Sequence, residues 1–229
     1  MEKVLVIGAS GLAREVLALA RSGTSHVVFG VVDDGWADMA ESFAGVPVLG
    51  SIERAVEYID IKLLVCVGSG AAREEIVGRL DVLGVGPDSY TTIIDPSVTI
   101  HGSSSVGRGS IILANTVFTT DVTVGSHVVI MPHVTLTHGN EVGDFATIAA
   151  GAALGGDVRI GKGAYIGMNA SIRQRVLVGP YSVLGMGAAL LTELPEHETW
   201  AGVPAVRLAA SVTAPQQQPS STTTPERSS

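Results

Sequence analysis

The sequence has a single cysteine, Cys66, and is poor in aromatic residues (4%) and in charged residues (16%). One cysteine excludes an intramolecular disulfide and a zinc site built from cysteines. The first apolar run, residues 4–7, is too short for a membrane-spanning helix or a signal peptide. The net charge of -8 disfavours binding to nucleic-acid phosphates. We therefore expect a cytoplasmic protein with no nucleic-acid or membrane partner and no metal, in which Cys66 is a core residue.

Glycine is abundant, with 28 residues, and a large apolar residue recurs at every sixth position from Ile94 to Leu190. Glycine directly follows eight of these 17 positions. A six-residue repeat is typical of short strands that form the sides of a three-sided column, so that 18 residues complete one coil. Residues 18 apart then lie one strand spacing, roughly 4.8 Å, from each other. The repeat predicts a parallel β-helix of just under six coils in residues 93–208.

Both ends of such a column expose strands that must be covered. We expect the preceding domain to cover one end and residues 191–208, which include Trp200, to form a short cap at the other. Residues 209–229 are polar and rich in Pro, Ser and Thr, which predicts a disordered tail.

Residues 1–92 alternate between apolar runs and helical patterns. Strands are expected at 4–7, 27–32 and 62–67, and helices at 12–22 and 71–83. This order predicts an α/β, Rossmann-like unit with a parallel sheet.

Ligands of such sheets bind beyond the carboxyl ends of the strands. Glycines after the first strand permit close approach of a phosphate to a helix N-terminus. An acidic side chain after the second strand can accept a hydrogen bond from a ribose hydroxyl. Arg73, after the third strand, is close enough in sequence to contact a phosphate. Ser10 and Ala13 replace two glycines of the dinucleotide fingerprint, so a nucleotide or sugar nucleotide is favoured over a redox dinucleotide. The alternative is that these glycines only connect strands to helices. The candidate acceptor-binding residues are Gly8, Ser10, Gly11, Asp33, Asp34, Gly68 and Ser69.

The α/β unit opens with GASGLAREV, the hexapeptide repeat follows, and the chain closes this region with WAGVPAVRL. Over residues 1–208 this combination resembles the bacterial PglD/NeuD-type acyltransferases. The resemblance implies a left-handed β-helix, a homotrimer with coenzyme A between neighbouring subunits, and transfer of an acetyl group from acetyl-CoA to an amine or hydroxyl of a sugar or sugar nucleotide.

The resemblance also implies the catalytic residues. The family's histidine segment matches residues 138–145, which makes His138 the candidate general base, and the oxyanion-binding amide matches Gly156. These positions are 18 apart, so the repeat by itself predicts that they occupy equivalent corners of adjacent coils. A histidine base and a backbone N–H in this relation suit direct acyl transfer in a ternary complex.

Several positions depart from the family pattern. Gly139 replaces the acidic residue beside the histidine, for which Glu141 or Asp144 are possible substitutes. Leu12 replaces a histidine, and Met131, a candidate acceptor-binding residue, stands where amine-acetylating members carry asparagine. We expect an altered acceptor or a slower enzyme.

Four further positions are candidates for contact with coenzyme A. Thr147 stands where some family members have a second histidine near the cofactor. Arg173 and Arg175 are expected on the coil after Gly156, where they can meet a phosphate, and Gly202 lies next to Trp200 in a segment suited to an adenine contact.

Three other functions remain open from the sequence. A trimer that binds a sugar nucleotide without catalysis fits the altered surroundings of His138. A zinc hydratase of the γ-carbonic anhydrase kind would use His133 and His138 with His101 or His127 as the third ligand. A nucleotidyltransferase would need a basic phosphate-binding loop, which the short N-terminal unit lacks. His127 and His133 are otherwise expected at the surface or in a subunit interface.

Overall fold

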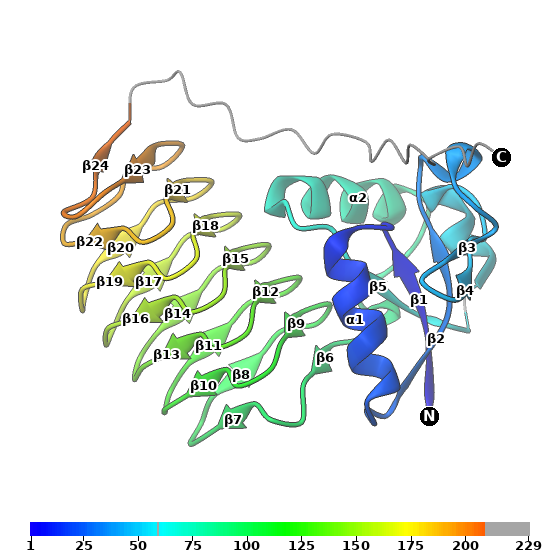
Figure 1. Ribbon diagram of the computed structural model, residues 1–229, viewed down its shortest axis with the longest axis horizontal. Helices are drawn as coiled ribbons and strands as arrows, with labels where there is room; N and C mark the ends of the chain where they lie inside the picture. Colours follow the sequence, from blue (N-terminus) through cyan, green and yellow to red (C-terminus); the bar gives the residue numbers. More distant parts are fainter. Residues whose placement is uncertain (59, 209–229) are drawn as a thin grey trace, which may run out of the picture.

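The computed structural model describes residues 1–58 and 60–208, so the predicted disordered tail lies outside the described residues. It has an α/β region and a three-sided column of short parallel strands. The α/β region lies beside the column (Figure 1). The predicted fold class, an α/β unit joined to a left-handed parallel β-helix, is confirmed.

The α/β region is built on a parallel sheet of three strands in the order β2-β1-β5. Ser10 and Ser69 precede the two helices that follow β1 and β5, and each side-chain oxygen accepts a hydrogen bond from the first turn. This satisfies backbone donors that a helix start leaves free, which is why both helices begin there. The elements are β1 (Glu2–Ile7), α1 (Gly11–Arg21), β2 (His26–Val32), β5 (Lys62–Val65) and α2 (Gly70–Val82). The connections contain η1 (Trp36–Asp38), β3 (Ser42–Phe43), β4 (Val46–Pro47), η2 (Ile52–Tyr58) and η3 (Pro87–Ser89).

Except at the terminal cap, the column consists of two-residue strands that pair in parallel with the strand 18 residues away. Its three sides are called here the domain face, the second face and the third face. The domain face contains β6 (Ile93–Ile94), β9 (Ile111–Ile112), β12 (Val129–Ile130), β15 (Thr147–Ile148), β18 (Tyr165–Ile166), β21 (Val183–Leu184), β23 (Thr199–Ala201) and β24 (Val206–Arg207). The second face contains β7 (Thr99–Ile100), β10 (Val117–Phe118), β13 (Thr135–Leu136), β16 (Ala153–Leu154), β19 (Ser171–Ile172) and β22 (Ala189–Leu190). The third face contains β8 (Ser105–Val106), β11 (Thr123–Val124), β14 (Glu141–Val142), β17 (Arg159–Ile160) and β20 (Leu177–Val178).

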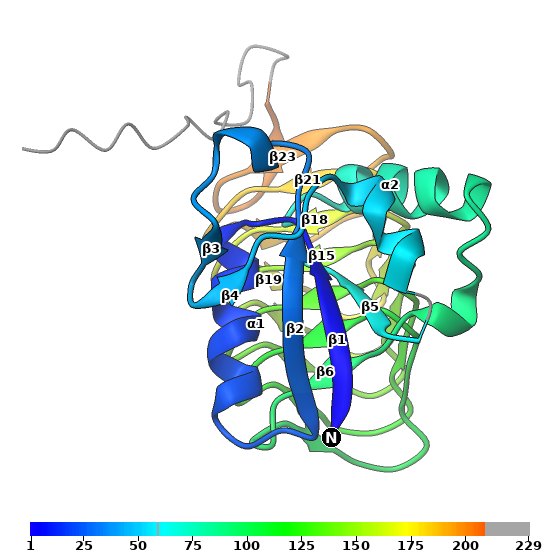
Figure 2. The ribbon, with the colours of Figure 1, turned by 90° about the vertical axis from the view of Figure 1, so that its right-hand side faces the viewer.

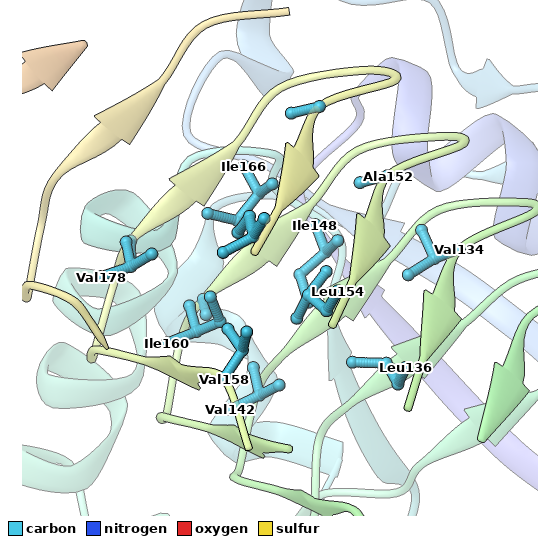
Figure 3. Packing of buried hydrophobic residues seen from close by; sticks show 14 of the residues in the cluster. Val134, Leu136, Val142, Ile148, Ala152, Leu154, Val158, Ile160, Ile166 and Val178 are labelled. Carbon is cyan, nitrogen blue, oxygen red and sulfur yellow. The ribbon is translucent and has the colours of Figure 1, made fainter. Parts of the chain in front are cut away.

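The sixth-position residues fill the inside of the column. Ile148, Leu154 and Ile160 come from the three faces of one coil and are all buried in the same cluster (Figure 3). Because the second residue of each strand points inward, the first points outward and is free to make contacts on the surface of the column.

The α/β region covers a side of the column, which corrects the expectation that it covers an end (Figure 2). Ile93, Ile111 and Val129 point outward from the domain face and belong to the same buried cluster as residues of β1 and α1. These apolar side chains offer the domain a larger surface than the end of the first coil, where Ile100 stays 40% exposed. The other end is covered as expected: Leu194, Ala205 and Trp200 pack against the core.

Candidate active site

The corner between β13 and β14, where the second and third faces meet, brings His138 and Gly156 together as their spacing predicts. A Cβ placed on Gly156 would lie 2.2 Å from Cε1 and 2.4 Å from Nε2 of His138, so the imidazole lies directly against the glycine. The His138 side chain is 64% exposed. The ring is therefore accessible to a ligand on its outer side.

The Gly156 N–H is available as a donor. Among the hydrogen bonds of the described residues, Gly156 contributes only its carbonyl oxygen, which accepts from Arg175 N at 2.8 Å. A free amide beside an imidazole is the pairing that stabilises an oxyanion while a base removes a proton.

A carboxylate that the sequence analysis did not single out lies at this corner. Asp157 Oδ1 is 4.0 Å from His138 Nδ1, and Asp157 Oδ2 is 3.8 Å from Arg175 Nε. The two substitutes considered from the sequence are engaged elsewhere: Glu141 pairs with Arg159 at 3.6 Å, and Asp144 accepts from Ser126 N at 2.7 Å. The signal for Asp157 was present in the repeat, because it stands 18 residues after Gly139.

A groove of about 510 Å³ runs along the third face and reaches the corner between the third face and the domain face. Its lining carries charges of both signs, and includes Glu141, Asp144, Arg159 and Lys162. Arg173 and Arg175 are exposed on the coil beyond Gly156, whereas Gly202 lies at the terminal cap, where its carbonyl accepts from Ala189 N at 3.0 Å. The two arginines therefore lie at the corner that carries His138. The groove lies along the adjoining third face, and Gly202 lies several coils away.

Thr147 and Met131 lie on the domain face rather than at this corner. The Thr147 hydroxyl donates to Gly68 O at 3.0 Å and accepts from Arg73, so this buried side chain belongs to the contact between the domains. Met131 packs against the buried cluster that contains Leu12. Leu12 and Met131, which both depart from the family pattern, thus lie in one apolar cluster.

The loops at the carboxyl ends of β1, β2 and β5 meet at one edge of the sheet, as predicted. Ser10 Oγ donates to Cys66 O at 2.6 Å, which ties the loop after β1 to the end of β5. Gly8 has φ +95°, a conformation that glycine adopts readily, and Gly11 begins α1. Ser69 precedes α2, and Gly68 lies between β5 and this serine.

The acidic pair after β2 also lies at this edge. Asp33 Oδ2 accepts from Ala9 N at 2.7 Å, which joins the ends of β2 and β1. Asp34 forms an ion pair with Arg79 at 2.7 Å. The structure therefore brings all the candidate acceptor-binding residues of the α/β region to one edge, with both carboxylates already accepting hydrogen bonds.

Arg73 does not lie where a phosphate can reach it, which corrects the expectation from the sequence. Its side chain is completely buried, with Nε donating to His127 O at 2.9 Å and Nη2 to Phe145 O at 2.7 Å. Nη1 donates to Val67 O at 2.8 Å and to Gly68 O. Arg73 therefore joins the end of β5 to one corner of the column on two adjacent coils, and its charge is satisfied by backbone carbonyls.

His127 is buried at the same contact, so the expectation of a surface position is wrong for it; His133 is exposed. The His127 ring stacks on Phe145 at 5.1 Å and meets the edge of Tyr90 at 4.6 Å. Burial, followed by the Arg73 charge, lowers the pKa of His127 to about 4. Cys66 is a buried core residue as expected, and burial raises the pKa of its thiol.

Comparison with known proteins finds similarity to sugar acetyltransferases. The family model of the PglD N-terminal domain matches residues 3–80. A UDP-N-acetylbacillosamine N-acetyltransferase of Bacillus subtilis (strain 168) is 28% identical over 118 residues, which are 50% of this chain and 52% of the relative. The chain thus matches about half the length of this curated relative.

Two solved structures match nearly the whole chain. The acetyltransferase domain of PglB from Neisseria gonorrhoeae FA1090, in complex with acetyl coenzyme A, is 29% identical with a TM-score of 0.79, over 90% of this chain and 99% of that one. PerB from Caulobacter crescentus, in complex with CoA and GDP-perosamine, is 25% identical with a TM-score of 0.82, over 91% of this chain and 98% of that one. Residues 3–80 are thus similar to the PglD N-terminal domain, and nearly the whole chain is similar to these two acetyltransferases.

The PglD-type resemblance predicted from the sequence is therefore confirmed, and the predicted enzyme class and acyl donor agree with the names of these proteins. Within residues 1–58 and 60–208 no three His, Cys, Asp or Glu side chains gather as a metal site requires. No helix in these two ranges is long and apolar enough to cross a membrane.

Proposed function

We propose that this chain transfers an acetyl group from acetyl-CoA to the amino group of a sugar carried on a nucleotide. The observation that carries the proposal is the exposed His138 imidazole lying against Gly156, whose N–H makes no other hydrogen bond among the described residues. The relatives named above supply the substrate class: one is named for a UDP-linked sugar and another binds CoA with GDP-perosamine.

Acetyl-CoA would supply the activated acetyl group as a thioester. His138 Nε2 would accept the proton that the amine loses as its nitrogen bonds to the carbonyl carbon. The Gly156 N–H would donate to the carbonyl oxygen as negative charge grows on it. The His138 imidazolium would then return its proton to the sulfur when the carbon–sulfur bond breaks. This is direct transfer, without a covalent enzyme intermediate.

Coenzyme A would lie along the groove of the third face, with Arg173 and Arg175 available to its phosphates. The charged lining of the groove and its position on the face that adjoins the His138 corner support this placement. The nucleotide of the acceptor would bind at the edge that carries Gly8, Asp33 and Gly68.

The two halves of this site are on different sides of the chain. The acceptor edge packs on the domain face, whereas His138 lies at the corner opposite that face. We propose that a homotrimer brings the acceptor edge of one protomer to the His138 corner of another. This arrangement accounts for a base that is exposed in the single chain.

The test is acetyl-CoA consumption, measured as thiol release, with a panel of amino-sugar nucleotides. His138→Ala is expected to lower turnover about 10²–10⁴-fold, the usual loss for a general base. The control is His133→Ala, which removes an exposed histidine at the preceding corner, between β12 and β13. This variant is expected to keep its activity. Binding of a sugar nucleotide without thiol release by the native protein would instead favour a non-catalytic binding trimer.

A further inference from the structure

The residue that follows His138 is a glycine, so this position has no side chain that can orient the imidazole. The carboxylate near its Nδ1 comes from the next coil, with Asp157 Oδ1 at 4.0 Å. A neutral imidazole accepts a proton at Nε2 only when its own proton is on Nδ1, and an acceptor facing Nδ1 favours that tautomer. The position of Asp157 therefore bears directly on the chemistry proposed for His138.

The backbone holds Asp157 in this position. Asp157 N donates to His138 O at 2.9 Å, which fixes the two residues on adjacent coils. Its φ of 57° lies in the left-handed region, which aspartate tolerates better than most residues. Arg175, on the coil beyond, faces the other carboxylate oxygen at 3.8 Å.

Glycine at position 139 is what makes room for this carboxylate. A Cβ on Gly139 would lie 2.4 Å from Asp157 Oδ1, closer than two unbonded atoms can approach. A side chain at position 139 and the observed placement of Asp157 therefore exclude each other. The absence of a side chain at position 139 therefore allows the Asp157 carboxylate to occupy its place beside His138.

We propose that Asp157 is the positioning residue for His138: its carboxylate holds the proton on Nδ1 and leaves Nε2 free to act as the base. This inference depends on the proposed acetyl transfer. The 4.0 Å separation shortens to a hydrogen bond when substrates fill the site, since such contacts commonly tighten in the productive complex. The charged groups near the His138 ring are the Asp157 carboxylate, which faces Nδ1, and Arg175, which faces the other oxygen of that carboxylate.

The test compares Asp157→Asn with Asp121→Asn. Asp121 occupies the same corner two coils earlier, with a similar φ of 53°, but its carboxylate accepts from the Ser103 hydroxyl. Asp157→Asn is expected to lower kcat about 10- to 100-fold, less than loss of the base itself, with the KM for acetyl-CoA within about twofold. Asp121→Asn is expected to keep both constants.

A second measurement separates this role from a structural one. In protein labelled with ¹⁵N-histidine, the His138 signals are identified by their loss in His138→Asn. The native protein is expected to show Nδ1 protonated, and Asp157→Asn to shift the ring toward the Nε2-protonated form. Asp157→Ala is expected to lower kcat as well, and adding Gly139→Asp to it, where the shortened side chain leaves room for a Cβ at position 139, restores a carboxylate beside the ring and is expected to recover part of kcat.

The inference is overturned if Asp157→Asn keeps native kcat and the native tautomer while His138→Ala is inactive. An equal loss in Asp121→Asn, or no recovery in a folded double variant, also contradicts it. If His138→Ala retains full activity, the proposed function fails on its own account. The tautomer measurement still decides whether Asp157 orients the ring.

Discussion

At the scale of single residues, the site depends on Gly156 having no side chain. The imidazole of His138 fills the space that a Cβ would occupy, and the glycine N–H stays open beside it. The family resemblance singled out this pair in the sequence, and the spacing of 18 residues predicted that the two residues lie on adjacent coils. Asp157 was not predicted, because it is distant from His138 in sequence and approaches it only from the next coil.

Gly156→Ala tests this contact. Gly156 does not have a left-handed φ, so alanine fits the backbone and the fold is expected to persist. The added methyl group displaces the ring, and kcat is expected to fall at least about tenfold, as for other misplaced catalytic groups.

Steady-state kinetics and a thermal unfolding curve measured together would check this expectation. Gly156→Ala should add little to the loss already caused by His138→Ala, because both act through the same ring. A fully active Gly156→Ala would contradict the contact.

At the scale of elements, the strands have only two residues each, and their stability comes from stacking. The hexapeptide repeat predicted this part of the fold because every inward position falls in one register, from Ile94 to Leu190. The repeat could not predict how the α/β region docks, because that depends on outward residues such as Ile111 and Val129. Those residues look like any strand residue in the sequence, and only their grouping on one face distinguishes them.

Two isoleucines at equivalent positions of the repeat should respond differently to truncation. Ile148 is fully buried at the middle of the column, and Ile100 is 40% exposed in the first coil. Ile148→Ala is expected to lower the free energy of unfolding by about 2–5 kcal/mol, the usual cost of a core cavity. Ile100→Ala should cost less than about 1 kcal/mol, because little buried surface is lost.

Urea unfolding of both variants provides the measurement. Equal decreases in the free energy of unfolding would show that Ile100 is buried in solution, which would contradict its exposure in the first coil.

At the scale of the whole molecule, the contact between the domains contains buried groups that carry or can take up charge. Arg73 is held there by carbonyl oxygens of both domains, and the neutral His127 ring lies between Tyr90 and Phe145. The sequence placed these residues near a ligand or at the surface, because a lone Arg or His gives no sign that another domain covers it.

The lowered pKa of His127, about 4, makes the stability of the protein depend on pH. Above pH 6.5 the ring is neutral in both the folded and the unfolded chain, so it contributes no pH dependence there. As the pH falls from 6.5 to about 4, the unfolded chain takes up the proton first. The free energy of unfolding is therefore expected to decrease, by at most about 3 kcal/mol from this group.

Unfolding at pH 7.5 and pH 5 isolates this contribution when wild type is compared with His127→Phe, which keeps an aromatic ring against Phe145. The variant should lose less stability between the two pH values than the native protein. His133→Phe, at the next corner and exposed, should keep the native difference. An unchanged difference in His127→Phe would contradict the burial of a neutral His127.

The 18-residue coil also sets the unit by which insertions and deletions can be accommodated. Six extra residues in the column would keep each later anchor pointing inward, but would move every later outward residue to the next face. An insertion between Ile93 and Val129 would therefore separate the outward residues that hold the α/β region. The same six residues between His138 and Gly156 would turn the glycine onto a different face and separate it from the imidazole. Elsewhere in the column a whole added coil would leave this pair intact. The packing of the column therefore restricts changes in length to multiples of six residues. Between His138 and Gly156 the active site does not tolerate a change of six residues.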